Sequence, residues 1–263
     1  AVGAGAAGWG HFEAGWVRLE SLPCPLPGLA PELEGLRIAH LSDVHTVGEF
    51  YGRRIESGRS GASGNERLRR SLAQLDRIHA EEPLDMVLVS GDMTDAGRSS
   101  EWAEFLDAVS RYPDLAKRTL MIPGNHDLNI VDRANPARLD LPTSPNKRLR
   151  KLRVLSAMGM VQGERVHVVD RTRGRLGGTL AQALTPHLGA MARFADTGKP
   201  IWSKELTDLW PNVFPMVLAP ERDDGLGIIL LDSNADTHFS FTNALGLITT
   251  DQVRALESAC AQY

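Results

Sequence analysis

Apolar and polar residues follow two patterns between positions 36 and 127. Continuous apolar runs predict three buried strands, at 36–43, 84–92 and 118–125. Between these runs, apolar residues recur every three or four positions and predict helices at 65–81 and 99–112. Strands that alternate with helices and have no polar face indicate an α/β fold with a largely parallel sheet covered on both sides.

The segments outside this region have weaker patterns. Residues 16–22 alternate like an edge strand and continue into a proline-rich link, so we expect a lead-in over residues 1–35. The main domain is then expected over residues 36–263. The strand pattern returns in NVFPMVLAP and at 226–234, and a last helix is predicted at 250–261.

Residues 131–210 differ in character from the segments on either side. Proline breaks interrupt them, and helices are predicted at 146–157 and 179–195. They contain 14 Lys and Arg against 7 Asp and Glu, although the whole chain has a net charge of −4. We interpret this segment as a basic, cap-like insertion. Its run KRLRKLR, at 147–153, is either a rim for an anionic substrate or, more simply, a solvated helix face.

The composition is that of a globular protein, with 42% hydrophobic and 24% charged residues among 263. No apolar run reaches the roughly 18 residues that a membrane-spanning helix needs, so no transmembrane segment is predicted. The opening AVGAGAAGWG fits either the region beside a removed signal or anchor, or an arbitrary chain boundary. Cytoplasmic and membrane-peripheral locations both stay open. Cys24 and Cys260 form neither a disulfide framework nor a zinc spacing.

Polar residues follow each of the first three predicted strands, as Asp43-Val44-His45, Gly91-Asp92 and Gly124-Asn125-His126-Asp127. Ligand sites in open α/β sheets form beyond the carboxyl ends of the strands, where these clusters would meet. Each cluster alone is also a common turn sequence. Their occurrence in this order, each at a strand end, favours a functional site.

The residue types in these clusters suit a divalent metal. Asp43 and Asp92 offer carboxylate oxygens, Asn125 offers a carbonyl oxygen, and His45 offers a ring nitrogen. In an extended chain, side chains two positions apart point to the same side, so we expect Asp43 and His45 to do so. Glycines at 91 and 124 would allow tight turns and a close approach of the backbone. A cation would also offset the repulsion between the carboxylates.

These three motifs, in this order, resemble those of the calcineurin-like metallophosphoesterase family. The resemblance covers residues 36–127 well and LGIILLDSN, at 226–234, more loosely. It implies a four-layer α/β/β/α sandwich of the metallophosphoesterase type that holds two divalent metal ions. Oxygen and nitrogen donors together suit manganese, iron or zinc.

The resemblance also implies roles for individual residues and a reaction. Asp43 and His45 would bind the first metal, Asp92 would bridge both metals, and Asn125 would bind the second. His126 would face the substrate and assist the leaving group, and Asp127 would orient or polarise His126. A metal-bridging hydroxide would then hydrolyse a phosphomonoester or a phosphodiester. Because the chain is acidic overall and a cap would narrow access, we expect a small-molecule or lipid-linked substrate rather than nucleic acid.

The chain departs from the family pattern after His126. The family continues with a single histidine and a Gly-His-x-His motif, and neither His167, His187 nor His238 lies in such a motif. We expect His167 to be structural within a strand and His187 to lie in a helix, whereas His238 either approaches the site or packs in a loop. The fold is therefore expected to be incomplete at its C-terminus. The alternative is a non-catalytic or split scaffold that lacks a complete second metal site.

Overall fold

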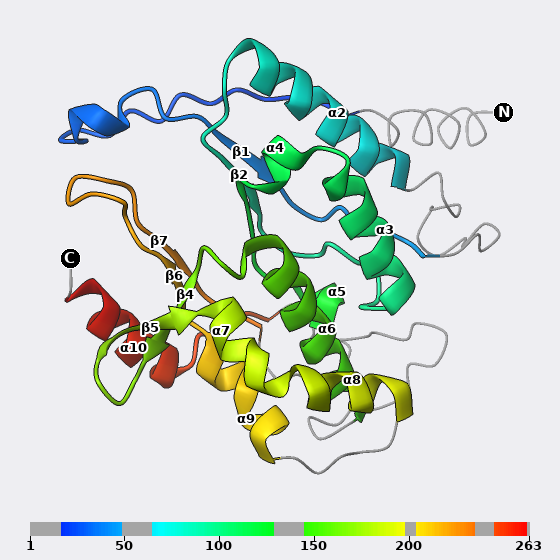
Figure 1. The fold of residues 1–263 in the computed structure, drawn as a ribbon. Coiled ribbons are helices and arrows are strands. Elements are labelled where there is room, and N and C mark those ends of the chain that lie inside the picture. The colour runs from blue at the N-terminus through cyan, green and yellow to red at the C-terminus, as the bar shows by residue number, and fades with distance from the viewer. Residues whose placement is uncertain (1–16, 49–64, 129–144, 198–203, 235–244, 262–263) are drawn as a thin grey trace, which may run out of the picture.

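The computed structural model describes residues 17–48, 65–128, 145–197, 204–234 and 245–261. Its strands form two sheets (Figure 1). The first is parallel and has the order β1 (Ile38–Leu41), β2 (Met86–Val89), β3 (Thr119–Met121). The second is antiparallel and has the order β5 (Arg175–Thr179), β4 (His167–Asp170), β6 (Met216–Leu218), β7 (Ile228–Leu230). The predicted α/β class is thus confirmed, and the number of layers stays a prediction.

The parallel sheet is built as the sequence pattern predicts. Its strands are connected through α2 (Asn65–Glu81) after β1, and through α3 (Ser99–Ser110) and α4 (Pro113–Ala116) after β2. Leu68, Leu72 and Leu75 form the buried side of α2, as their spacing predicts. Ala39 of β1 and Val87 of β2 are paired in the sheet and pack with Leu75. This burial fixes the first two strands against the helices that follow them.

Helix α6 (Pro145–Gln162) belongs to the main core. Val154, Leu155 and Met158 are buried there, and the Gln162 side chain bonds both the N–H and the carbonyl of Met121 in β3. Strands β4 and β5 lie in the second sheet. The described part of the predicted cap therefore packs within the main fold. The boundaries 1–35, 36–263 and 131–210 themselves stay predictions.

The predicted helix at 179–195 is broken into three pieces, which are α7 (Leu180–Leu184), η3 (Thr185–His187) and α8 (Leu188–Thr197). Pro186 has no N–H to continue the helical bonding, so a single helix was the wrong prediction here. The Thr179 hydroxyl accepts a bond from the N–H of Gln182 and caps α7. His187 falls at the end of η3 rather than inside a long helix.

The predicted edge strand at 16–22 is wrong for its described part, since residues 17–22 have no strand structure. Leu19 is 53% and Leu22 is 81% exposed, so their alternation buries no face. A strand also needs a neighbour for its N–H and carbonyl groups, and no strand in the described part of the chain pairs with these residues. Of the lead-in, residues 31–33 form the short helix η1 (Pro31–Leu33).

The C-terminal part of the domain follows its predicted pattern. Strands β6 and β7 lie in the two predicted strand regions, and α9 (Lys204–Val213) precedes β6. Helix α10 (Thr250–Cys260) packs Ala255 and Ala259 against Val169 and Val217 of the second sheet. Within the described residues, no helix has both the length and the apolar character needed to cross a membrane.

Candidate metal centre

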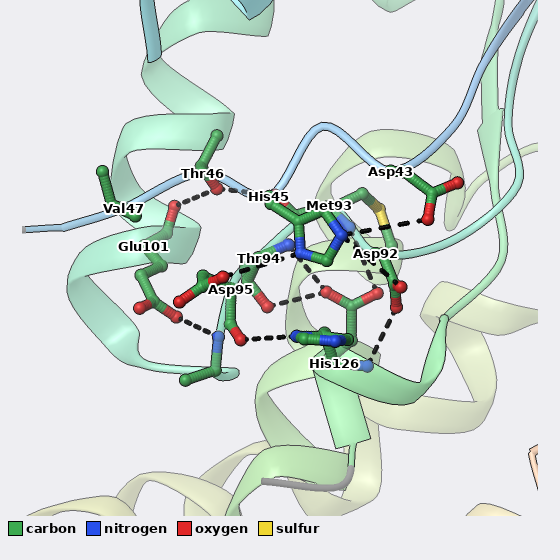
Figure 2. A network of polar contacts seen from close by, with 12 residues as sticks. Asp43, His45, Thr46, Val47, Asp92, Met93, Thr94, Asp95, Glu101 and His126 are labelled. Carbon is green, nitrogen blue, oxygen red and sulfur yellow. Dashed lines mark hydrogen bonds and ion pairs between the residues drawn. The ribbon is translucent and has the colours of Figure 1, made fainter. Parts of the chain in front are cut away.

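The three polar clusters meet where β1, β2 and β3 end, at one edge of the parallel sheet (Figure 2). Asp43 and His45 follow β1, Asp92 follows β2, and Asn125 begins the short helix α5 (Asn125–Leu128) after β3. Parallel strands place their carboxyl ends side by side, which explains this convergence of residues distant in sequence.

The backbone at three of these residues is left-handed, with φ of 54° at Asp43, 44° at His45 and 52° at Asp92. Non-glycine residues rarely adopt such values, which cost on the order of 1–3 kcal/mol each. The N–H of Asp43 donates to the carbonyl of Gly91 at 3.2 Å, and the N–H of His45 donates to the carbonyl of Asp92 at 2.8 Å. The turns after β1 and β2 therefore hold each other in place.

The expectation that Asp43 and His45 share one side of an extended chain is wrong, because both residues are left-handed. Their side chains nevertheless come close. Nε2 of His45 lies 3.8 Å from Oδ1 of Asp43 and 3.8 Å from Oδ2 of Asp92. The ligand atoms of His45, Asp92 and His126 all lie within 4.8 Å of one another. These donor types and spacings fit a divalent cation.

The two predicted glycines are required by close contacts. Gly91 has φ of 109°, and a Cβ there would lie 2.9 Å from the Cα of Gly124. A Cβ on Gly124 would clash with the carboxylate and the N–H of Asp92. The loops after β2 and β3 can thus approach this closely only with glycine at both positions.

His126 is held through its backbone and its ring. Its N–H donates to Oδ1 of Asp92 at 2.9 Å, and its Nδ1 lies 2.8 Å from the carbonyl oxygen of Asp95. A carbonyl only accepts, so Nδ1 must hold the proton of this bond. Nε2 therefore carries the lone pair of the neutral ring. The rings of His126 and His45 meet edge to face, with centroids 4.5 Å apart.

The buried Asp127 carboxylate joins the loops after β2 and β3. It accepts bonds from the N–H of Thr94 at 2.9 Å, the Thr94 hydroxyl at 2.7 Å, the N–H of Gly124 at 2.9 Å and the N–H of Met93 at 3.3 Å. Burial raises the pKa of Asp127 to about 6, although the bonds from Gly124 and Thr94 lower it. The predicted action of Asp127 on His126 stays a prediction, and these contacts favour an action through the backbone.

Asp95 contacts both histidines of the site and was missed in the sequence. Its Oδ1 lies 3.7 Å from Nδ1 of His45, and its carbonyl bonds the His126 ring. The only signal was its place three residues after Asp92. The same loop is fixed by buried Glu101, which accepts bonds from the N–H groups of Ala96 and Arg98. Burial raises the pKa of Glu101, while the bonds from Arg98 and Ala96 lower it.

The basic run at 147–153 contributes arginines that bond to backbone carbonyls near the site. Lys147 is only 2% and Arg150 only 3% exposed, so the interpretation of this run as a solvated face is wrong at both positions. Burial argues equally against their use as a substrate rim. Arg150 donates to the carbonyl of Leu128, and Arg153 donates to the carbonyl of Gly97. The guanidinium groups therefore bind the loops around the candidate ligands.

A cleft of about 230 Å³ lies beside the candidate ligands. One wall contains Asp43, Asp92 and Asn125, which brings the predicted ligand Asn125 to the same space as the carboxylates. The lining also contains Ser233 and Asn234, which follow β7 of the second sheet. The sequence reasoning did not identify Asn234, although LLDSN stood at the end of a predicted strand.

Among the later histidines, His167 bonds to a residue outside this group. His167 begins β4 as predicted, and its Nδ1 bonds the carbonyl of Gly177 at 3.1 Å. His187 ends η3. His238 lies outside the described residues, so both expectations for it stay predictions.

Comparison with known families identifies one match. A family model described as calcineurin-like phosphoesterase matches residues 36–219, which run from just before β1 to just after β6. This range contains every residue predicted for the metal site and for catalysis. No curated protein and no solved structure matches the chain.

Replacement of Asp127 tests the bond between the loops. We expect Asp127→Ala to lower the free energy of unfolding by about 3 kcal/mol or more, because it leaves buried N–H groups of Met93, Thr94 and Gly124 without acceptors. Urea denaturation followed by circular dichroism measures this loss. Asp107→Ala, which removes an exposed ion pair with Arg111, is the matched control and should change stability by less than about 1 kcal/mol. Equal losses in the two variants would contradict the assignment.

Proposed function

Because the chain belongs to the calcineurin-like phosphoesterase family, we propose that it hydrolyses a phosphomonoester or a phosphodiester with divalent metal ions. The observation that carries this proposal is the group of His45, Asp92 and His126, whose ligand atoms lie within 4.8 Å of one another. The group stands at the carboxyl ends of the parallel strands, beside a cleft. Family membership and this donor group together support a metal-dependent phosphoesterase.

The proposed metal holders are Asp43, His45, Asp92 and Asn125, whereas His126, which also belongs to the group of three, is proposed to act on the leaving oxygen. Their oxygen and nitrogen donors suit two ions of manganese, iron or zinc. Bound ions would supply a water of lowered pKa and would offset the charge of the phosphoryl oxygens. The left-handed turns at Asp43, His45 and Asp92 support this proposal, because bonds between the loops fix the backbone there. Such preorganisation reduces the cost of assembling the site.

His126 is proposed to act in its imidazolium form, in which Nε2 also carries a proton, and to donate that proton to the leaving oxygen. Its Nδ1 is bound to the Asp95 carbonyl, so the ring cannot turn freely and Nε2 is the atom left for proton transfer. The bond from its N–H to Asp92 couples the position of the ring to a candidate metal ligand. General-acid assistance of this kind is typically worth about 10²–10⁴-fold in rate.

Asp127 is proposed to act by position rather than by contact with the substrate. It binds the N–H of Gly124, just before Asn125 and His126, and it binds Thr94 in the loop after Asp92. A shift in this carboxylate would move a candidate ligand and the proposed acid together.

A small-molecule or lipid-linked substrate is proposed over nucleic acid. Binding to nucleic acid relies on accessible Lys and Arg that neutralise phosphates. The most basic run of the chain places Lys147 and Arg150 inside the protein, and the net charge is −4. The cleft of about 230 Å³ is also small for a duplex.

The alternative is a scaffold that keeps the fold but lacks a complete second metal site. One observation supports this alternative. The described residues contain one group of three His, Cys, Asp or Glu side chains that could hold a metal ion together, formed by His45, Asp92 and His126. Asp43 and Asn125 are then the proposed donors that remain for a second ion. The two possibilities differ in whether the protein hydrolyses phosphate esters at a rate that mutation of Asp92 lowers.

We expect Asp92→Asn to lower kcat/KM for bis(p-nitrophenyl) phosphate and p-nitrophenyl phosphate at least ~100-fold in Mn²⁺. The amide keeps an oxygen for the N–H of His126 but loses the charge that a bridging ligand needs. Asp107→Asn, on the exposed side of α3, should keep wild-type rates. Wild-type protein that hydrolyses neither ester with Mn²⁺, Fe²⁺ or Zn²⁺ would establish the scaffold.

The proposed role of His126 predicts a dependence on the leaving group. His126→Ala should lower kcat by about 10²–10⁴-fold for an alkyl phosphate ester, whose leaving oxygen needs a proton. The loss should be much smaller for the p-nitrophenyl ester, whose anion leaves without one. Steady-state kinetics on the two esters, for the phosphomono- or diester class that the wild type accepts, measures this. Equal losses on both esters would instead assign His126 to metal or substrate binding.

A further inference from the structure

Asn234 connects the second sheet to the loop that precedes the proposed acid. Its side-chain Nδ2 donates to the carbonyl of Pro123 at 2.9 Å, across 111 positions of sequence. The same nitrogen donates to Oδ1 of Asp232 at 2.9 Å, and the N–H of Asn234 donates to that oxygen at 3.0 Å. Asn234 also pairs with Gly246 in an antiparallel bridge. The bonds to Asp232 therefore fix the side-chain amide of Asn234, and the bridge to Gly246 fixes its backbone.

Asp232, which binds the side chain of Asn234, is itself bonded by side chains from two helices. Asp232 is buried, and its Oδ2 accepts a bond from the indole N–H of Trp210 in α9 at 2.9 Å. The side chain of Gln252, in the first turn of α10, bonds both the N–H and the carbonyl of Asp232. Asp232 thus has little freedom to move, and neither has the amide that it orients.

The bond to Pro123 falls at a sensitive place. Pro123 is followed by Gly124, Asn125 and His126, and β3 has already ended at Met121. Asp127 of α5 and Asp92, in the loop after β2, hold this turn by accepting bonds from the N–H groups of Gly124 and His126. Asn234 adds a bond from the end of β7 in the second sheet, and it also lines the cleft.

We infer that Asn234 is a positioning residue that sets the turn from Pro123 to His126 relative to the second sheet. Without its donor, the Pro123 carbonyl would lose a fixed partner and the turn would open more often. The chemical consequence rests on the proposed function, because the turn carries the proposed ligand Asn125 and the proposed acid His126. The structural consequence does not rest on it, and the two can be tested separately.

The test compares Asn234→Ala and Asn234→Asp with Asn212→Ala in the full chain. The first two remove the Nδ2 donor, and the control removes an exposed asparagine of α9. Hydrogen exchange, followed by mass spectrometry of peptides covering residues 119–128, reports the opening of the N–H groups of Gly124 and His126. The expected result is roughly five- to tenfold faster exchange in this peptide for both Asn234 variants. Peptides of α2 should exchange as in the wild type.

Kinetics on bis(p-nitrophenyl) phosphate with Mn²⁺ then tests the chemical consequence. The expected result is a lower kcat with little change in KM, because the reacting groups are displaced while the cleft remains. Unchanged exchange at 119–128 would overturn the inference, and so would faster exchange throughout the chain, which indicates a general loss of stability. Wild-type protein without activity would refute the proposed function, while the exchange result would still decide the role of Asn234.

Discussion

The candidate site depends on the buried Asp127 carboxylate, which binds the loops after β2 and β3 to each other. Its two oxygens accept bonds from the N–H groups of Met93, Thr94 and Gly124 and from the Thr94 hydroxyl, so four hydrogen bonds from two loops end on one side chain. A buried carboxylate is costly unless it is bonded in this way. The same bonds therefore stabilise the carboxylate and fix the distance between Asp92 and the turn that follows β3.

The strain in the ligand turns is supported by the same arrangement. Asp43, His45 and Asp92 each have a left-handed backbone, and the turns after β1 and β2 are bonded to each other. The close approach of Gly91 and Gly124 then completes the contact among the three loops. The packed strands and helices around these turns stabilise the strained backbone. As a result, Asp43 and Asp92 line the cleft.

The sequence predicted the elements with strong periodicity and the residues that bring chemistry to the strand ends. Helix α2 starts and ends where its leucines predicted, because tertiary burial agrees with its local pattern. The edge strand at 16–22 failed because alternation does not supply a pairing partner. The buried position of Arg150 could not be predicted from a basic run, since its acceptor is the backbone carbonyl of Leu128, 22 positions earlier in the chain. Contacts of this kind are set by topology and not by spacing.

The central claim is that the ends of β1, β2 and β3 hold divalent metal ions. Equilibrium dialysis of the wild type and of Asp92→Asn against Mn²⁺, with metal content measured by mass spectrometry, tests it most directly. The account predicts two bound ions for each wild-type chain and a loss of binding in the variant, because Asp92 is the proposed shared ligand. Equal Mn²⁺ content in the two proteins, or no bound Mn²⁺, Fe²⁺ or Zn²⁺ in the wild type, would contradict it.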